Sequence, residues 1–404
     1  MRCPAATAAP YVAATAGGAG RLVARQPPGA GSLAPMSAVN LTSFLSRWTV
    51  WAPLAAVIAL VLSWGRDLPL FAVVLVAFCL AGAVLAAVHH AEVVAHRVGE
   101  PFGSLVLAVA VTVIEVALIV TLMVDGGPKS ASLARDTVFA AVMITCNGIV
   151  GLSLLVAALR HHVAVFNAEG AGAALATVAT LATLSLVLPT FTTSRPGPEF
   201  SAPQLTFAAV ASLGLYVLFV AVQTVRHRDY FVSVTHDGEP KNGSDDEHAE
   251  PPGRSAALFS LLLLLVALVA VVGDAKAVSP TIESGVESAG LPHAVVGVAI
   301  ALLVLLPETL AAVRAARRER VQTSLNLALG SAMASIGLTI PVIALATVWL
   351  EGPLLLGLGA THMVLLALTV VVAALTVVPG RATLLQGGVH LAILAAYIFL
   401  AVSP

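Results

Sequence analysis

The chain has 404 residues, of which 59% are hydrophobic and 10% are charged, and its formal net charge is −1. A soluble domain carries about 25% charged residues, so this composition excludes an ordinary soluble globule. A net charge this close to zero offers no electrostatic basis for binding nucleic acid. The sequence contains no HExxH, P-loop, GxSxG or CxxC motif, so the machinery of the familiar hydrolases and ATPases is missing. We therefore expect a membrane protein that is not an enzyme.

Residues 1–44 are rich in alanine, glycine and proline and predict a disordered tail. The rest of the chain contains apolar segments of about 20 residues, the length that crosses a hydrocarbon core of about 30 Å as a helix. Eleven such segments predict an all-α polytopic membrane protein with eleven transmembrane helices. They fall at 48–64, 69–90, 103–124, 136–160, 170–190, 203–225, 255–273, 292–313, 322–349, 352–378 and 383–402.

The distribution of lysine and arginine tests this helix count. With the N-terminus inside, alternate loops place fifteen lysines and arginines on the inner side and five on the outer side. Cytoplasmic loops of membrane proteins carry such an excess of positive charge. The count predicts a cytoplasmic N-terminus and an external C-terminus.

An acidic linker at 227–254 divides the chain into two halves of five helices each. We expect a leading helix at 45–66, a first repeat at 67–226 and a second repeat at 255–404. Because five helices is an odd number, equivalent segments of the two repeats cross the membrane in opposite directions. This is the pattern of inverted-topology repeats, whose substrate site lies near the membrane midplane.

Two lone carboxylates occupy equivalent places in the halves, Glu115 in TVIEVALIVTLM and Glu308 in VLLPETLAAV. An ionised group at the bilayer centre costs about 3 kcal/mol, so it is rarely there by accident. Thr112 shares a helix face with Glu115, and Pro307 exposes main-chain oxygens beside Glu308. Carboxylate, carbonyl and hydroxyl oxygens are the ligands that a hard cation such as Ca²⁺ prefers. The alternative is a tilted helix that places each glutamate at the membrane interface.

The helices that follow each glutamate offer neutral oxygens. Thr145 and Asn147 lie in MITCNGIVGLSLLV, and Ser331 and Ser335 lie one helical turn apart in TSLNLALGSAMASIGLTIP. Small and hydroxyl residues also serve as ordinary packing between membrane helices, so both interpretations stay open. Glu92, with His89, His90 and His96 around it, is an accessory candidate for a metal or proton-entry site, or else part of a solvated helix end.

Several stretches resemble the calcium/cation antiporter superfamily, in particular its proton-coupled bacterial branch of the ChaA type. In that superfamily two inverted repeats each carry a glutamate that binds the transported cation and exchanges it for protons. The resemblance assigns these roles to Glu115 and Glu308. It matches Asn147 to the Ser-Asn step of the first repeat and Ser331 to the Gly-Ser-Ala step of the second. It also matches Glu92 to an acidic residue that precedes the first repeat. It implies a bacterial plasma-membrane protein whose partners are lipid, cations and protons, with no cofactor. The stretches are EVVAHRVGEPFGSLVLAVAVTVIEVALIVTLM, ARDTVFAAVMITCNGIVGLSLLVAALRH, FNAEGAGAALATVATLATLSLVLPTF, LPETLAAVRAARRERVQTSLNLALGSAMASIGLTIP and LLQGGVHL.

The leading hypothesis is a secondary transporter that exchanges a cytoplasmic cation, Ca²⁺ first, for external protons by alternating access around Glu115 and Glu308. Exchange of Na⁺ or K⁺ for protons is the alternative, because Val111-Thr112 and Val304-Leu305 stand where the wider family often has Gly-Asn. A remote alternative is an intramembrane enzyme that uses paired carboxylates. The sequence predicts no oligomeric state.

Overall fold

The structure is a computed structural model that describes residues 48–66, 68–99, 102–126, 131–234, 252–292, 294–349 and 352–403. The predicted tail at 1–44 lies outside the described residues. So does most of the acidic linker, including the run from Asp245 to Glu250.

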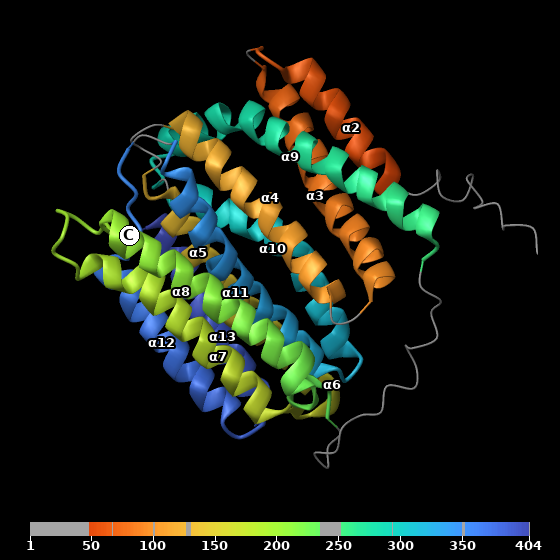
Figure 1. The fold of residues 1–404 in the computed structure, drawn as a ribbon, viewed down its shortest axis with the longest axis vertical. Helices are drawn as coiled ribbons and strands as arrows, with labels where there is room; N and C mark the ends of the chain where they lie inside the picture. Colours follow the sequence, from red (N-terminus) through yellow and green to blue (C-terminus); the bar gives the residue numbers. More distant parts are fainter. Residues whose placement is uncertain are drawn as a thin grey trace, which may run out of the picture. The chain divides into compact units, whose positions relative to one another are not determined.

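The described chain is almost wholly helical, and it reproduces each of the eleven expected segments (Figure 1). Three segments contain short π-helical or 3₁₀ turns, a feature often found at functional places in helices. Their bounds are α2 Trp48–Ser63, α3 Leu70–Val98, α4 Phe102–Gly126, α5 Leu133–Met143 continuing through η2 Ile144–Ile149 into α6 Val150–His161, α7 Ala168–Ala182 with η3 Thr183–Val187 and η4 Leu188–Thr190, α8 Ala202–Ala221 with η5 Val222–Arg226, η6 Arg228–Phe231, α9 Arg254–Ser288, α10 Ala294–Arg317, α11 Val321–Ala346, α12 Ala360–Val377 and α13 Leu384–Val402.

Three predicted segment ends are wrong by eight residues or more. α3 continues to Val98, beyond the expected 90, and α9 continues to Ser288, beyond the expected 273. The expected segment 352–378 begins as a helix only at Ala360, because the apolar residues before it form an extended connection. Leu356 and Leu358 are buried there, and Leu358 N donates to Leu186 O at 2.8 Å. Apolarity in this loop therefore serves packing between helix ends and not a membrane span.

In the described part of the chain, nine of the helices are long and apolar enough to cross a membrane. α2, with 16 residues, is shorter, and in α4 the apolar stretch is Val109–Thr121. Large apolar side chains such as Phe71, Phe78 and Leu375 are exposed on the helix surfaces. A soluble protein would expose few such residues in continuous bands, so these surfaces fit a lipid environment. The prediction of an all-α polytopic membrane protein is confirmed.

Contacts between loops sort the helix ends onto two sides. On one side, which we call the strand side, β1 (Ala164–Val165) after α6 pairs antiparallel with β2 (Arg381–Ala382) after α12. On the opposite side, Leu355 N before α12 donates to Ala131 O before α5 at 3.0 Å. Leu355 also forms an isolated antiparallel β-bridge with Glu199, and we call this the bridge side. An even number of helices, α7 to α12, separates β1 from β2, so their pairing agrees with the predicted alternation of crossings. The lysine and arginine count predicts that the strand side is cytoplasmic.

The helices pack in a reciprocal pattern. α4 of the first half contacts α11 of the second, and α10 of the second half contacts α5, η2 and α6 of the first. Likewise α8 packs on α11, while α13 packs on η2 and α6. Such reciprocity is what two repeats related by a pseudo-twofold axis would produce. The two repeats stay a prediction, which this packing supports.

Two apolar clusters meet at the helices that carry the glutamates. One contains buried residues of α2, α3 and α9 together with residues of α4 and Val304 of α10. The other contains residues of α5 to α8 and α10 to α13. α4 and α10 thus lie where the α2–α3–α9 group adjoins the remaining helices (Figure 1). The candidate site lies along this boundary.

Candidate cation site

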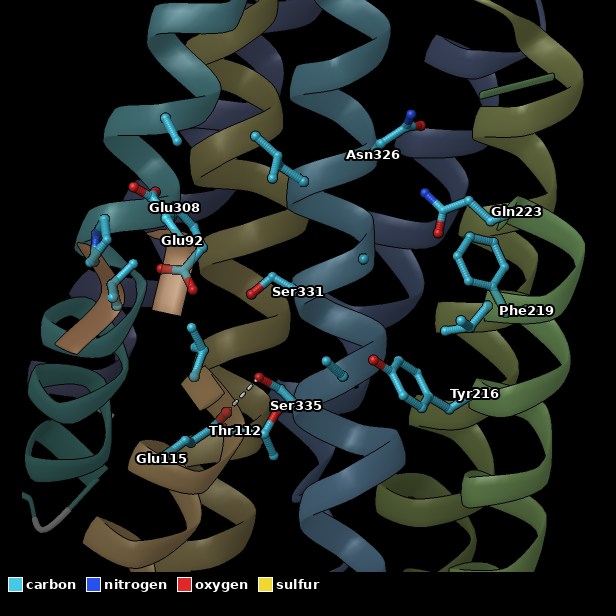
Figure 2. Close-up of a pocket in the computed structure, with 18 of the residues that line it drawn as sticks. Glu92, Thr112, Glu115, Tyr216, Phe219, Gln223, Glu308, Asn326, Ser331 and Ser335 are labelled. Carbon is cyan, nitrogen blue, oxygen red and sulfur yellow. Dashed lines mark hydrogen bonds between the residues drawn. The ribbon is translucent and has the colours of Figure 1, made fainter. Parts of the chain in front are cut away.

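A cavity of about 320 Å³ lies between α3, α4, α8, α10 and α11. Figure 2 shows carboxylate, hydroxyl and amide groups from these helices around it. Five of the predicted site residues line it, together with the accessory Glu92. The five are Thr112, Glu115, Glu308, Ser331 and Ser335.

Burial increases along the cavity from the strand side inwards. Thr323, near the start of α11, is exposed and Asn326 is half-buried, whereas Ser335 farther along the same helix is buried. Beyond Ser335, α8 and α11 pack together directly, since a Cβ added at Gly337 would lie 2.6 Å from Tyr216 Cβ. The cavity therefore reaches from the strand side to the level of Glu115 and ends there.

Glu115 lies at the closed end of the cavity and is only 3% exposed. Ser335 Oγ donates a hydrogen bond to its Oε2 at 2.8 Å (Figure 2). Its other oxygen, Oε1, is buried without a hydrogen-bond partner among the described residues. An unpaired buried carboxylate oxygen carries a large desolvation cost, so this position favours a proton or a bound cation.

Glu308 and Glu92 lie close together on the α10 and α3 side of the cavity (Figure 2). Glu308 Oε2 is buried and is not hydrogen-bonded to any described residue. Glu115 and Glu92 both lie near enough to Glu308 to repel its charge. No basic side chain among the described residues lines the cavity, although His89, His96 and Arg314 lie near Glu92. The lining therefore concentrates negative charge that nothing within the lining neutralises.

The polar groups of α11 complete the lining between the glutamates. Ser331 is half-buried near the middle of the cavity, one turn before Ser335 (Figure 2). Thr112 is buried one turn before Glu115 on α4. The structure thus brings polar side-chain oxygens from both predicted repeats to one place. Within the described part of the chain, no group of three or more His, Cys, Asp or Glu side chains has the arrangement of a metal site.

Thr145 and Asn147, the other two predicted site residues, do not line this cavity. Asn147 is 0% exposed, and its Nδ2 donates to Thr369 Oγ1 at 2.9 Å. Its Oδ1 lies 3.2 Å from His390 Nδ1, so the ring donates from Nδ1 to this amide oxygen. Thr145 donates to the backbone carbonyl of Ala141 at 2.7 Å. The Asn147 side chain therefore points into the packing of η2 against α12 and α13, whereas the Thr145 hydroxyl bonds to the backbone of its own helix.

The histidines beside Glu92 do not form a ligand cluster with it. His90 is buried, and its Nε2 lies 3.0 Å from Thr49 O of α2. This contact joins α3 to α2, so His90 serves packing, while Glu92 alone of this group lines the cavity. The cavity is also lined by Tyr216, Phe219 and Gln223 of α8 and η5, which were not predicted as site residues. Gln223, a polar residue near the end of an apolar run, was the available signal.

A family model described as sodium/calcium exchanger protein matches residues 68–225 and 259–403. The chain belongs to the sodium/calcium exchanger family. It is a cation/proton antiporter of the calcium/cation antiporter superfamily, of the ChaA type, and so a multi-pass membrane transporter and not an enzyme. The two matched stretches lie on either side of the acidic linker.

Relatives of this antiporter match it over most of their length. It is 46% identical over 364 residues to the y4hA protein of Sinorhizobium fredii, covering 88% of this chain and 96% of that one. It is 34% identical over 350 residues to the sodium-potassium/proton antiporter ChaA of Escherichia coli, covering 86% and 93%. The crystal structure of the H⁺/Ca²⁺ exchanger CAX has a TM-score of 0.65 at 15% identity, covering 90% of this chain and 93% of that one, and it shows a common fold.

Replacing Ser335 by alanine removes one hydrogen bond to Glu115 and leaves the carboxylate in place. A hydrogen bond to a charged group contributes about 1.5–3 kcal/mol, so we expect the half-saturating cation concentration of the antiporter to rise about tenfold. Initial rates of proton-coupled exchange in membrane vesicles would measure this. Ser335→Thr, which keeps a hydroxyl, is the matched control and should recover most of the affinity. An unchanged half-saturating concentration in Ser335→Ala would show that this bond has no part in binding.

Proposed function

We propose that the antiporter exchanges a cation from the strand side for protons from the bridge side, with Glu115 and Glu308 binding both. The observation that carries the proposal is that Glu115 and Glu308 line one cavity. Among the described residues, each has a buried oxygen without a hydrogen-bond partner, and no basic residue belongs to the lining. Glu115 and Glu308 together carry a charge of −2 when both are ionised, whereas the third carboxylate of the cavity, Glu92, has basic side chains near it. Two protons or one divalent cation neutralise that charge, so the same site can exchange one for the other.

Charge balance makes Ca²⁺ the leading cation. The cavity also offers hydroxyl oxygens from Thr112, Ser331 and Ser335, and Ca²⁺ takes six to eight oxygen ligands, with water completing the set. A monovalent cation would leave one negative charge, which a single retained proton would neutralise. Exchange of Na⁺ or K⁺ is therefore the second candidate, and the similarity of this chain to the sodium-potassium/proton antiporter of Escherichia coli favours it.

The cavity geometry corresponds to one state of an alternating-access cycle. It is open towards the strand side and closed by the contact of Tyr216 with Gly337. With the predicted cytoplasmic N-terminus, this is an inward-open state in a bacterial plasma membrane. We propose that the two predicted repeats exchange roles in the outward-open state, so that α10 and α13 separate as α4 and α8 close.

The cation is identified with everted vesicles from cells that overproduce the antiporter and lack comparable activities. Respiration acidifies the vesicles, a pH-sensitive dye reports the proton gradient, and Ca²⁺, Na⁺ and K⁺ are added in turn. We expect dequenching on Ca²⁺. Dequenching only on Na⁺ or K⁺ would show that the antiporter exchanges a monovalent cation for protons, the second candidate function. No response to any of the three cations would overturn both candidates.

A further inference from the structure

Two buried threonines beyond the closed end of the cavity have hydroxyl groups without partners. Thr339 of α11 and Thr137 of α5 are both 0% exposed, and neither Oγ1 has a hydrogen-bond partner in the described part of the chain. Threonines in other helices of the described chain bond back to the carbonyl four residues earlier: Thr121 of α4, Thr145 of η2, and Thr369 and Thr376 of α12 do so at 2.7–2.9 Å. Thr339 and Thr137 therefore forgo a bond that is available to a helical threonine.

Their places in the helices put both hydroxyls between Glu115 and the bridge side. Thr339 follows Ser335, the hydrogen-bond partner of Glu115, by one turn on the same face of α11. At 1.5 Å per residue it lies about 10 Å before the end of α11 on the bridge side. α5 begins on that side, and Thr137 lies about 6 Å into it by the same rise. α5 packs against both α11 and α10, so the hydroxyls belong to one layer of the helix bundle.

This layer is closed in the structure. Gly297 of α10 lies so close to α5 that an added Cβ would be 3.1 Å from Asp136 C and Thr137 N. At the bridge-side end, Asp136 accepts hydrogen bonds from Ser132 Oγ at 2.9 Å and Arg135 Nε at 2.7 Å. Arg135 Nη1 also donates to Gly357 O at 3.2 Å, which ties α5 to the connection before α12.

We propose that Thr339 and Thr137 line the bridge-side half of the cation path, which is collapsed here. The inference rests on the proposed exchange at Glu115 and Glu308. In the alternate state the two hydroxyls bind the permeating hard cation, or the water around it, through their oxygens. The buried hydroxyls cost stability in the closed state, and hydration in the open state removes that cost. Ser335, Thr339 and Thr137 then continue the oxygen ligands from the cavity to the opposite side of the membrane.

The test replaces each hydroxyl by a methyl group of nearly equal size, in Thr339→Val and Thr137→Val. Half-saturating cation concentrations are measured separately at the two faces, in right-side-out and everted vesicles. We expect a rise of about three- to tenfold at the bridge side only, because each variant loses one oxygen that contacts the cation or its water. The melting temperature should stay equal or rise, because an unpaired buried hydroxyl is removed. The result that overturns the inference is an unchanged half-saturating concentration at both faces, with or without a fall in melting temperature.

Ser260→Ala is the matched control. Ser260 of α9 is likewise 0% exposed with an unpartnered Oγ among the described residues, but it lies in a helix packed mainly on α2 and α3. Its removal should leave the half-saturating concentrations at both faces unchanged.

A second measurement separates this inference from the proposed function. In a background with Cys3, Cys79 and Cys146 replaced by alanine, Thr339→Cys is treated with a membrane-impermeant, positively charged thiol reagent added from the bridge side. Modification there, with Ser260→Cys unmodified, would support the path even if no cation in the panel were exchanged. Absence of modification while the protein exchanges a cation would overturn the path and leave the proposed function intact.

Discussion

Replacing Glu115 or Glu308 by glutamine should abolish exchange while the antiporter still inserts and folds. Each change keeps the size of the side chain but removes the charge that attracts the cation and the group that carries the proton. Removing one partner of a buried charge interaction costs about 3–5 kcal/mol, which corresponds to a loss of about a hundredfold or more. Dye-monitored exchange in everted vesicles measures the effect at cation concentrations up to saturation.

The control for this pair is Glu169→Gln. Glu169 is exposed at the start of α7, so its neutralisation should leave exchange at the wild-type rate. Detergent-solubilised variants should elute as the wild type does, which separates lost transport from lost folding. Normal transport by either cavity variant would contradict the two-carboxylate mechanism.

Replacing Gly387 by valine should strongly destabilise the contact between α6 and α13. A Cβ at this position would lie 2.7 Å from Leu155 N and 3.0 Å from Gly151 O. These are backbone atoms, so relief requires the two helices to move apart, and small residues allow such close approach in membranes. Overpacking of this kind costs about 1–3 kcal/mol or more, and we expect a melting temperature lower by about 2–10 °C. Thermal unfolding of the purified protein measures it.

The neighbouring glycine provides an internal comparison. A Cβ added at Gly388 meets no atom within 4 Å, so Gly388→Ala should leave the melting temperature unchanged or raise it slightly. If Gly387→Val unfolds at the wild-type temperature, the helices do not pack as closely as the structure has them. Because His390 lies one turn later on α13 and bonds to Asn147, a displaced α13 should also disturb η2.

The sequence by itself determined the class of protein and the helix order. Apolar runs long enough to span a bilayer can be recognised from the sequence without knowledge of tertiary contacts. In lipid the backbone N–H and C=O groups must form their hydrogen bonds within each helix, so such a run must be helical. The single carboxylates Glu115 and Glu308 stood out for the same reason, since charge at that depth is costly. Both now line one cavity, although their roles in binding stay predictions.

Only the tertiary structure decided which neutral oxygens face that cavity. Ser331 and Ser335 face it because α11 is regular there, whereas Asn147 lies in the π-helical turn η2 and bonds to Thr369 and His390. A π-turn shifts the helical register, and no local pattern revealed the shift. Tyr216 and Gln223 reach the cavity from α8 and η5 through packing alone. Hydropathy fixes which segments enter the membrane, but the face that each helix presents to its neighbours depends on contacts between residues far apart in the chain.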